Sequence, residues 1–145
     1  SLKGAIDLGI AMQLTNIARD VVEDKNRNRE YIEFNFSSIR ETVNNAEMFY
    51  KKSFFAISDI PIKSRFSVIV ARRVYKKIGY YILKQRNIEK YINAGKIYVP
   101  MPAKIIETIL SIVDFLRLLF VKNISYYKNE NHSILNQEIN LNERI

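Results

Sequence analysis

Apolar residues recur every three or four positions along most of this chain, the spacing that places them on one face of an α-helix. The pattern predicts one long helix over 5–23, ending near Lys25, and three further long helices. These are expected over 38–57, 63–84 and 102–121, with a short helical segment over 88–92. No segment is a convincing strand. The pattern therefore predicts an all-α protein.

Local signals place the ends of these helices. Ser38, followed three residues later by Glu41, fits a capping box at the start of the second helix. Pro61 interrupts the pattern before the third helix, and Pro102 suits the first turn of the last one. The polar stretch 26–31 is turn-like and separates the first two helices.

Length and composition are consistent with a single helical domain. The chain has 145 residues, within the usual range of one domain, and only four Gly and three Pro. The absence of Cys excludes disulfides, thiolate metal sites and Cys nucleophiles. Beyond position 121 the sequence turns polar and rich in Asn, so we expect a helical domain over 1–121 and a weakly structured tail over 122–145.

Net charge and targeting signals give only general information about partners and location. A formal net charge of +8 favours an anionic partner, but it does not distinguish a phosphorylated substrate from a lipid surface or nucleic acid. The sequence opens without the features of a signal peptide, so we expect a cytoplasmic protein. The most apolar stretch, 105–121, contains Glu107, Asp114 and Arg117, which argues against a membrane-spanning helix.

The most informative feature is a polar stripe within the first predicted helix. Gln13, Asn16, Asp20 and Asp24 are spaced three, four and four residues apart, so their side chains should share one face, with Glu23 beside it. Apolar residues cover much of the remaining circumference. The stripe is therefore either the solvated face of an amphipathic helix or a functional site.

The functional interpretation is a divalent metal site. Carboxylates one turn apart, preceded by amide side chains, supply oxygen ligands that suit Mg²⁺ shared with substrate phosphates. Arg19 adds a guanidinium that can bind the same phosphates. Spacing alone does not decide between this site and a solvated helix face.

The sequence also carries a resemblance to a known family. Residues 7–24 (DLGIAMQLTNIARDVVED) closely resemble the second aspartate-rich motif of the squalene and phytoene synthase family. Further resemblance lies in 29–31, 46–50 and 71–78, and more weakly in 95–100. The resemblance spans about residues 4 to 120.

The resemblance implies a fold, a reaction and a set of site residues. Family members are all-α isoprenoid synthases that join two prenyl diphosphates head to head, so the chain would be the C-terminal part of such a helical bundle. Geranylgeranyl diphosphate is the expected substrate type, with Mg²⁺ as cofactor and Mn²⁺ as a substitute. The roles carried over are metal binding by Asp20 and Asp24 with Glu23 as an auxiliary acid, and diphosphate binding by Gln13, Asn16, Arg19 and Tyr75.

The sequence departs from the family pattern in ways that matter for activity. The first aspartate-rich motif lies upstream of the position at which this sequence starts, and Asp59 and Asp114 each lack a second acid one turn away. The segment 31–46 also looks shorter than in the family, and Ile32-Glu33 replaces the usual Leu-Pro. These departures predict a fragment that needs a separate N-terminal half, or self-association, to act. Its long helices should then expose apolar faces.

Other functions remain open at this stage. A non-catalytic assembly protein or a decayed pseudo-enzyme would keep the fold without the reaction. Nucleic-acid binding through the basic positions Arg72, Arg73, Lys76 and Lys77 is disfavoured, because such a cluster is usually a solvated helix face. Peripheral membrane contact through the apolar segment 110–121 is conceivable, although we expect that segment to pack in the core. Core packing is also expected for most of the aromatic residues Tyr31, Phe49, Tyr50, Phe54 and Phe55.

Overall fold

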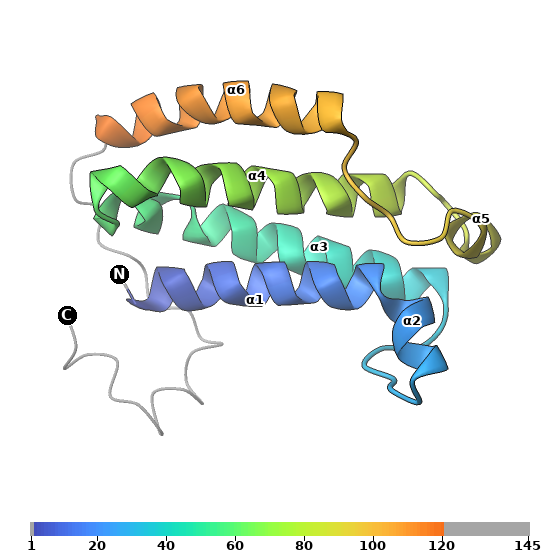
Figure 1. The fold of residues 1–145 in the computed structure, drawn as a ribbon. Coiled ribbons are helices and arrows are strands. Elements are labelled where there is room, and N and C mark those ends of the chain that lie inside the picture. Colours follow the sequence, from blue (N-terminus) through green and yellow to red (C-terminus); the bar gives the residue numbers. More distant parts are fainter. Residues whose placement is uncertain (1, 121–145) are drawn as a thin grey trace, which may run out of the picture.

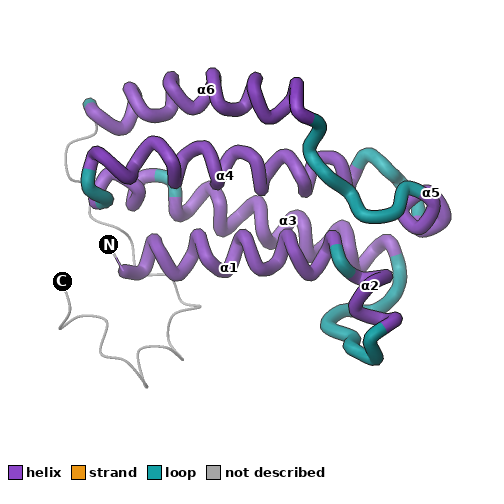
Figure 2. Tube along the Cα trace, in the orientation of Figure 1, coloured by secondary structure: helices purple, strands orange, loops and turns teal. Residues whose placement is uncertain are grey.

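The computed structural model describes residues 2–120, and every regular element within them is a helix (Figure 2). This confirms the all-α prediction, whereas the predicted tail lies outside the described residues. The elements are α1 (Leu2–Arg19), α2 (Val21–Asn26), α3 (Phe36–Ser53), η1 (Phe55–Asp59), α4 (Ile62–Leu83), α5 (Ile88–Asn93) and α6 (Met101–Leu119).

The four long helices run alongside one another in a bundle. Figure 1 shows α1 at one side, α3 and α4 in the middle and α6 at the other side. Helix α1 packs against α3 and α4, and α6 packs mainly against α4. The two short helices α2 and α5 lie at the same end of the bundle (Figure 1). That end carries the polar cluster described below.

Small residues allow the helices to approach closely. Ala11 of α1 and Ala46 of α3 are buried in one apolar cluster, and Ala18 is buried in a second. On α4, a Cβ at Gly79 would lie 3.0 Å from Cγ1 of Val43 on α3, tighter than ordinary van der Waals contact. Bulkier side chains at such positions would force the helices apart.

The predicted aromatic core is largely present. Phe49, Tyr50 and Phe54 are buried, and Phe55 packs at the edge of an apolar cluster. Tyr31 is the exception, because it lies in the loop after α2 with 60% of its surface exposed.

The first predicted helix is not continuous. It ends at Arg19, and Asp20 adopts φ −102° and ψ 14° before α2 starts at Val21. The backbone hydrogen bonds from Asp20 N–H to Asn16 (2.9 Å) and from Asp24 N–H to the Asp20 carbonyl (2.8 Å) persist across this break. The chain therefore bends sharply at Asp20, and α2 points away from the axis of α1 (Figure 1).

The predicted capping box is wrong. Helix α3 starts at Phe36, and its N-cap is Asn35, whose side-chain oxygen accepts a hydrogen bond of 2.8 Å from the backbone N–H of Ser38. Ser38 therefore lies inside the first turn. Asn and Ser are both strong N-cap residues, and the extended backbone at Asn35, with φ −141° and ψ 158°, lets Asn35 take this role.

The basic side of α4 is not a solvated face, contrary to prediction. Arg72 is buried and donates from Nε (3.1 Å) and Nη2 (2.7 Å) to the carbonyl of Tyr50. Arg73 donates to Glu107 (2.9 Å) and to Asp114 (2.7 Å), both on α6. The remaining pairs of this cluster are Lys76–Glu47 (2.9 Å) and Lys77–Glu107 (3.2 Å). The basic residues therefore hold α6 and α3 to α4.

The expected core position of α6 is also wrong, because most of its apolar side chains are exposed. This observation agrees with the prediction that the helices would expose apolar faces. None of the described helices is long and apolar enough to cross a membrane.

The assignment of the α3 cap can be tested with a pair of alanine variants. We expect Asn35→Ala to lower the free energy of unfolding by about 1 kcal/mol, because the N–H of Ser38 loses its acceptor. Ser38→Ala should change it by less than about 0.5 kcal/mol, because only the backbone of Ser38 makes the capping bond. Urea unfolding followed by circular dichroism measures both. A larger loss of unfolding free energy in Ser38→Ala than in Asn35→Ala would instead identify Ser38 as the cap.

Candidate functional site

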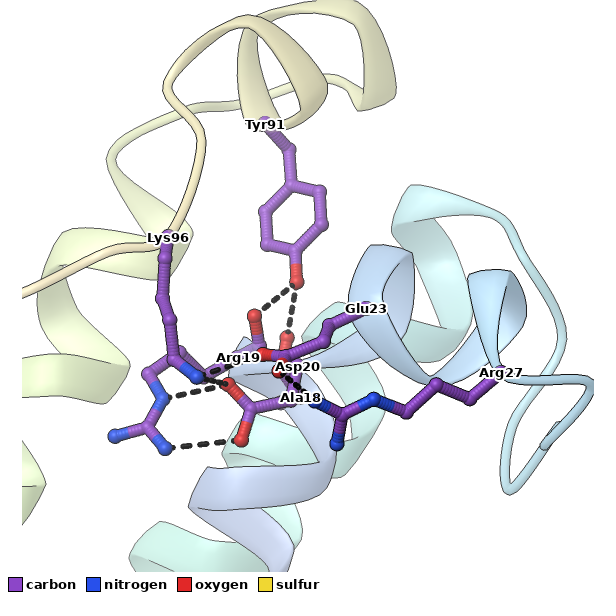
Figure 3. Close-up of polar contacts among 7 residues, drawn as sticks. All are labelled: Ala18, Arg19, Asp20, Glu23, Arg27, Tyr91 and Lys96. Atoms are coloured by element: carbon purple, nitrogen blue, oxygen red, sulfur yellow. Dashed lines mark hydrogen bonds and ion pairs between the residues drawn. The ribbon is translucent and has the colours of Figure 1, made fainter.

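A hollow of about 190 Å³ lies where α1 bends into α2. One wall comes from α1 and α2, and the other comes from α5 and the loop that follows it (Figure 3). Gly95, with φ 64° in the left-handed region, ends α5 and turns the chain so that Lys96 faces the bend. The residues that line the hollow include Arg19, Asp20, Glu23, Asn26, Tyr91 and Lys96.

Tyr91 of α5 closes one side of the hollow. Its hydroxyl lies 2.8 Å from the carbonyl oxygens of both Ala18 and Arg19, so its hydrogen is directed at the last carbonyls of α1 (Figure 3). Carbonyls at a helix C-terminus lack intrahelical donors, and this hydroxyl supplies one. Tyr91 is 2% exposed, and burial raises the pKa of its hydroxyl to about 12. The hydroxyl therefore stays protonated at neutral pH.

Charged side chains form a continuous network across the hollow. Arg19 binds both carboxylate oxygens of Asp20, at 2.8 and 2.9 Å. The ammonium of Lys96 lies 2.7 Å from Glu23 and 3.5 Å from Asp20, so it bridges the two carboxylates. Arg27 completes the network with a 2.8 Å contact to Glu23 (Figure 3).

This network keeps its groups charged. Burial raises the pKa of Asp20, but the hydrogen bonds and charge of Arg19, together with Lys96, outweigh it and lower that pKa overall. The hydrogen bond from Lys96 lowers the pKa of Glu23, and the reciprocal bond raises the pKa of Lys96. Two carboxylates and three cations therefore face one another at neutral pH.

The structure brings several of the predicted residues together. Arg19, Asp20 and Glu23 share the hollow, whereas Asn16 precedes Asp20 by one turn and does not line it. The side-chain oxygen of Asn16 is buried without a hydrogen-bond partner, an arrangement that is rare in folded proteins. Tyr75 packs against two apolar clusters. The hydrogen bond with Asp20 is the main reason that the pKa of Arg19 is raised, and Tyr75 makes a smaller electrostatic contribution.

Two of the predicted site residues, Gln13 and Asp24, do not line this hollow. Gln13 is exposed on α1, about two turns before the bend. Asp24 lines a different hollow, together with Val21, Arg29 and Tyr31. The bend at Asp20 therefore separates Asp24 from the surface shared by Asp20 and Glu23, and its role as a metal ligand stays a prediction.

The donor set suits a hard cation only in part. The carboxylates of Asp20 and Glu23 and the free oxygen of Asn16 are the oxygen ligands that Mg²⁺ prefers. Among residues 2–120, however, no group of three Asp, Glu, His or Cys side chains is placed to hold a metal ion. An ion here would need further ligands from water and from substrate phosphates.

Sequence reasoning missed Tyr91, Arg27 and the pairing of Lys96 with the carboxylates. Lys96 falls in the weakly resembling segment 95–100, which hinted at its importance but not at its partners. The contacts of Tyr91 and Lys96 join residues more than 70 positions apart, so no local pattern reveals them. The pair of Arg27 with Glu23 is different, because its i,i+4 spacing is a local helical signal that the sequence does contain.

Comparison with known proteins shows similarity to one family. The family model described as squalene/phytoene synthase matches residues 2–32, which contain α1, the bend and α2. A 15-cis-phytoene synthase of Enterobacter agglomerans is 30% identical, with 58% of this chain and 36% of that protein covered. A second, from Pantoea ananas, is 32% identical, with 54% and 32% covered. The chain is therefore similar to the squalene/phytoene synthase family over part of its length.

The extent of the family match is limited. The chain spans about a third of the length of the curated relatives it matches. The part matched by the family model contains Gln13, Asn16, Arg19, Asp20, Glu23 and Asp24 but not Tyr75. No solved structure matches the chain.

The bond from Tyr91 predicts a stability difference that depends on pH. Because the pKa is raised by folding, this contribution is present below pH 10 and is lost as the pH rises from about 10 to 12. We expect Tyr91→Phe to lower the free energy of unfolding by about 1 to 3 kcal/mol at pH 7 and by progressively less above pH 10. Urea unfolding across this pH range measures the difference. Tyr80→Phe, at an exposed position, should show neither effect, and a pH-independent deficit in Tyr91→Phe would contradict the assigned bond.

The bridging role of Lys96 predicts a change in acidity. In Lys96→Gln, we expect the pKa of Glu23 to rise toward its ordinary value, because its strongest hydrogen bond is lost. The pKa of Asp20 should rise less, because Arg19 still binds both of its oxygens. Carboxyl-carbon NMR titration measures both. Lys90→Gln, on the exposed side of α5, is the control, and an unchanged Glu23 would disprove the bridge.

Proposed function

We propose that this chain supplies one half of a Mg²⁺-dependent prenyltransferase site of the phytoene synthase type. The reaction would be the head-to-head condensation of two prenyl diphosphates, such as geranylgeranyl diphosphate, in isoprenoid or carotenoid synthesis. The observation that carries the proposal is the cluster of Asp20, Glu23, Arg19 and Lys96 at the bend of α1, within the segment matched by the family model. Phytoene-type rather than squalene-type chemistry is favoured because the two relatives described above are phytoene synthases.

In this proposal Asp20 and Glu23 bind the cation, with Asn16 offering its free side-chain oxygen. Mg²⁺ keeps several waters and usually takes one or two carboxylates plus phosphate oxygens, so an incomplete protein ligand set is adequate. When bound, the ion would neutralise negative charge on the departing diphosphate. Mn²⁺ would serve in its place.

The cations of the hollow then change partners. Without a ligand, Lys96 and Arg19 neutralise the two carboxylates. A divalent cation on Asp20 and Glu23 would take over that neutralisation and release Lys96 and Arg19 to bind diphosphate oxygens. A guanidinium offers paired N–H donors that match phosphate geometry. Tyr75, close to Arg19, could donate its hydroxyl hydrogen to the same diphosphate.

The proposed site is incomplete without a second acidic surface. A diphosphate leaves readily only when positive charge surrounds it, and one bend with two carboxylates holds few metal ions. Among residues 2–120, no group of three Asp, Glu, His or Cys side chains is placed to hold a metal ion, at the bend or elsewhere. We propose that the other half comes from a separate polypeptide segment carrying the first aspartate-rich motif, or from self-association.

A second candidate is a non-catalytic relative that serves as an assembly protein or is a decayed pseudo-enzyme. The observation in its favour is the complete internal pairing of Asp20 and Glu23 with Arg19, Arg27 and Lys96. A network whose carboxylates are already paired with cations needs no metal to remain folded. Ligand binding distinguishes this candidate from the first.

The test is calorimetric binding of a nonreactive prenyl diphosphate analogue, with and without Mg²⁺. We expect binding only with Mg²⁺, weakened about tenfold or more in Asp20→Asn, because a direct metal ligand is lost. Glu41→Gln, an exposed acid on α3, is the matched control and should bind as the unaltered chain does. Asp24→Asn, measured alongside, tests the predicted ligand that lies in the other hollow.

Two results would reject the proposed half-site. The first is absence of Mg²⁺-dependent binding by the unaltered chain, which would favour the non-catalytic candidate. The second is equal binding by Asp20→Asn and Glu41→Gln, which would place the analogue away from the bend of α1.

A further inference from the structure

A second hollow, of about 400 Å³, lies between α3, α4 and α6, and we call it the outer hollow. Volumes of this order hold small organic molecules, and the hollow at the bend of α1 is smaller. The three helices lie alongside one another in Figure 1, and α4 supplies most of the lining residues. Tyr75 projects from another side of α4, toward α1. A segment that completes the site at the bend would face α1, so it does not account for the outer hollow.

Three of the four cations that line the outer hollow are paired with carboxylates. The pairs are Lys76–Glu47 at 2.9 Å, Lys77–Glu107 at 3.2 Å, Arg73–Glu107 at 2.9 Å and Arg73–Asp114 at 2.7 Å. The side chains of Lys76 and Glu47 are 31% and 37% exposed, so a ligand can reach this pair from solvent. Ion pairs as exposed as this one are weak. Lys76 can therefore exchange its carboxylate for an anionic ligand.

Arg72, the fourth cation, lies in the wall of the outer hollow without a carboxylate partner. It is 6% exposed, it donates twice to the carbonyl of Tyr50, and its guanidinium lies 4.8 Å from the centroid of the Phe54 ring. Among residues 2–120, no carboxylate forms an ion pair with it. Burial lowers the pKa of Arg72, although an Arg side chain stays protonated in proteins. Buried charges are usually paired, so an anion in the hollow would supply the missing counter-ion.

Apolar surface lines the outer hollow beside these cations. It comes from Val43 on α3 and from Tyr80 and Leu83 on α4. The ammonium of Lys77 lies 5.0 Å from the centroid of the Tyr80 ring, so cationic and apolar surfaces adjoin. A simple inorganic anion would contact only the cations, whereas a ligand with an apolar body would also remove these side chains from water. The lining therefore favours an amphipathic anion.

We propose that the outer hollow binds a small organic phosphate monoester with an apolar body, without a metal ion. Arg72 and Lys76 are one helical turn apart on α4, so a single phosphate group can contact both. A phosphate monoester carries close to two negative charges at neutral pH, which match the charge of Arg72 and that of Lys76 once it leaves Glu47. The apolar body would lie against the apolar lining. No residue of the proposed prenyl site takes part.

Calorimetric titration of the full chain with 1-naphthyl phosphate, in the presence of a metal chelator, tests the proposal. We expect a dissociation constant of about 1 mM or lower, as is usual for a ligand of this size. 1-Naphthol lacks the anionic group and inorganic phosphate lacks the apolar body. Each should bind at least about tenfold more weakly than 1-naphthyl phosphate.

Two variants should change the affinity in opposite directions. Lys76→Gln should weaken binding about tenfold, because a charge-assisted hydrogen bond is lost. Glu47→Gln should strengthen binding, because Lys76 no longer has to leave a carboxylate. The matched controls are Lys63→Gln and Glu41→Gln, which make the same charge changes at exposed positions on α4 and α3 outside the hollow. Circular dichroism verifies folding, and Glu47→Gln with its control suffices should Lys76→Gln unfold.

Several outcomes would overturn the proposal. Absence of 1-naphthyl phosphate binding by the folded, unaltered chain would show that the outer hollow is not a site for this class of ligand. Equal affinity for 1-naphthol would reduce the binding to apolar adsorption, and equal affinity for inorganic phosphate would reduce it to simple anion binding. Equal effects of the hollow variants and their controls would indicate a general effect of net charge. Binding that requires Mg²⁺ would place the ligand at the bend of α1.

Discussion

The hydroxyl of Tyr91 and the carbonyls of Ala18 and Arg19 form the contact on which the candidate site depends. It joins α5 to the end of α1 across more than 70 residues of sequence, at the point where the first helix bends. The bend directs Asp20 and Glu23 into the hollow, and the attached α5 brings Lys96 over them. Without this contact, no buried hydrogen bond would join α5 to the end of α1. The exposed ion pairs would remain, but ion pairs of this kind contribute little to stability.

A second set of polar contacts organises the opposite side of α4. Arg72 and Arg73 reach the carbonyl of Tyr50 on α3 and the acids of α6, so one helix holds two neighbours through guanidinium groups. Tyr75 lies on the other side of the same helix, toward α1 and Arg19. Helix α4 thus separates the candidate site from the surface formed by α6.

The sequence predicted the helices well because their apolar spacing is regular, and the residues Arg19, Asp20 and Glu23 were predicted to share a site. The break at Asp20 was missed because the spacing of apolar residues continues through it. The partners Lys96 and Tyr91 were missed because their contacts are distant in sequence. The orientation of α6 was wrong for a different reason: an amphipathic pattern shows which residues share a face, but the assumption that the apolar face turns inward failed where Arg73 binds Glu107 and Asp114.

The two ion pairs of Arg73, with Glu107 and with Asp114, also fix the register of α6 against α4. Glu107 and Asp114 are seven residues apart, two helical turns, and one guanidinium binds both. A slide of α6 by a single turn along α4 would break both contacts at once, so the helix has one favoured position rather than several. Few apolar side chains of α6 are buried, so the ion pairs with Arg73 contribute much of the binding of α6 to α4. We therefore expect α6 to unfold first as a cooperative unit, while α1, α3 and α4 remain folded.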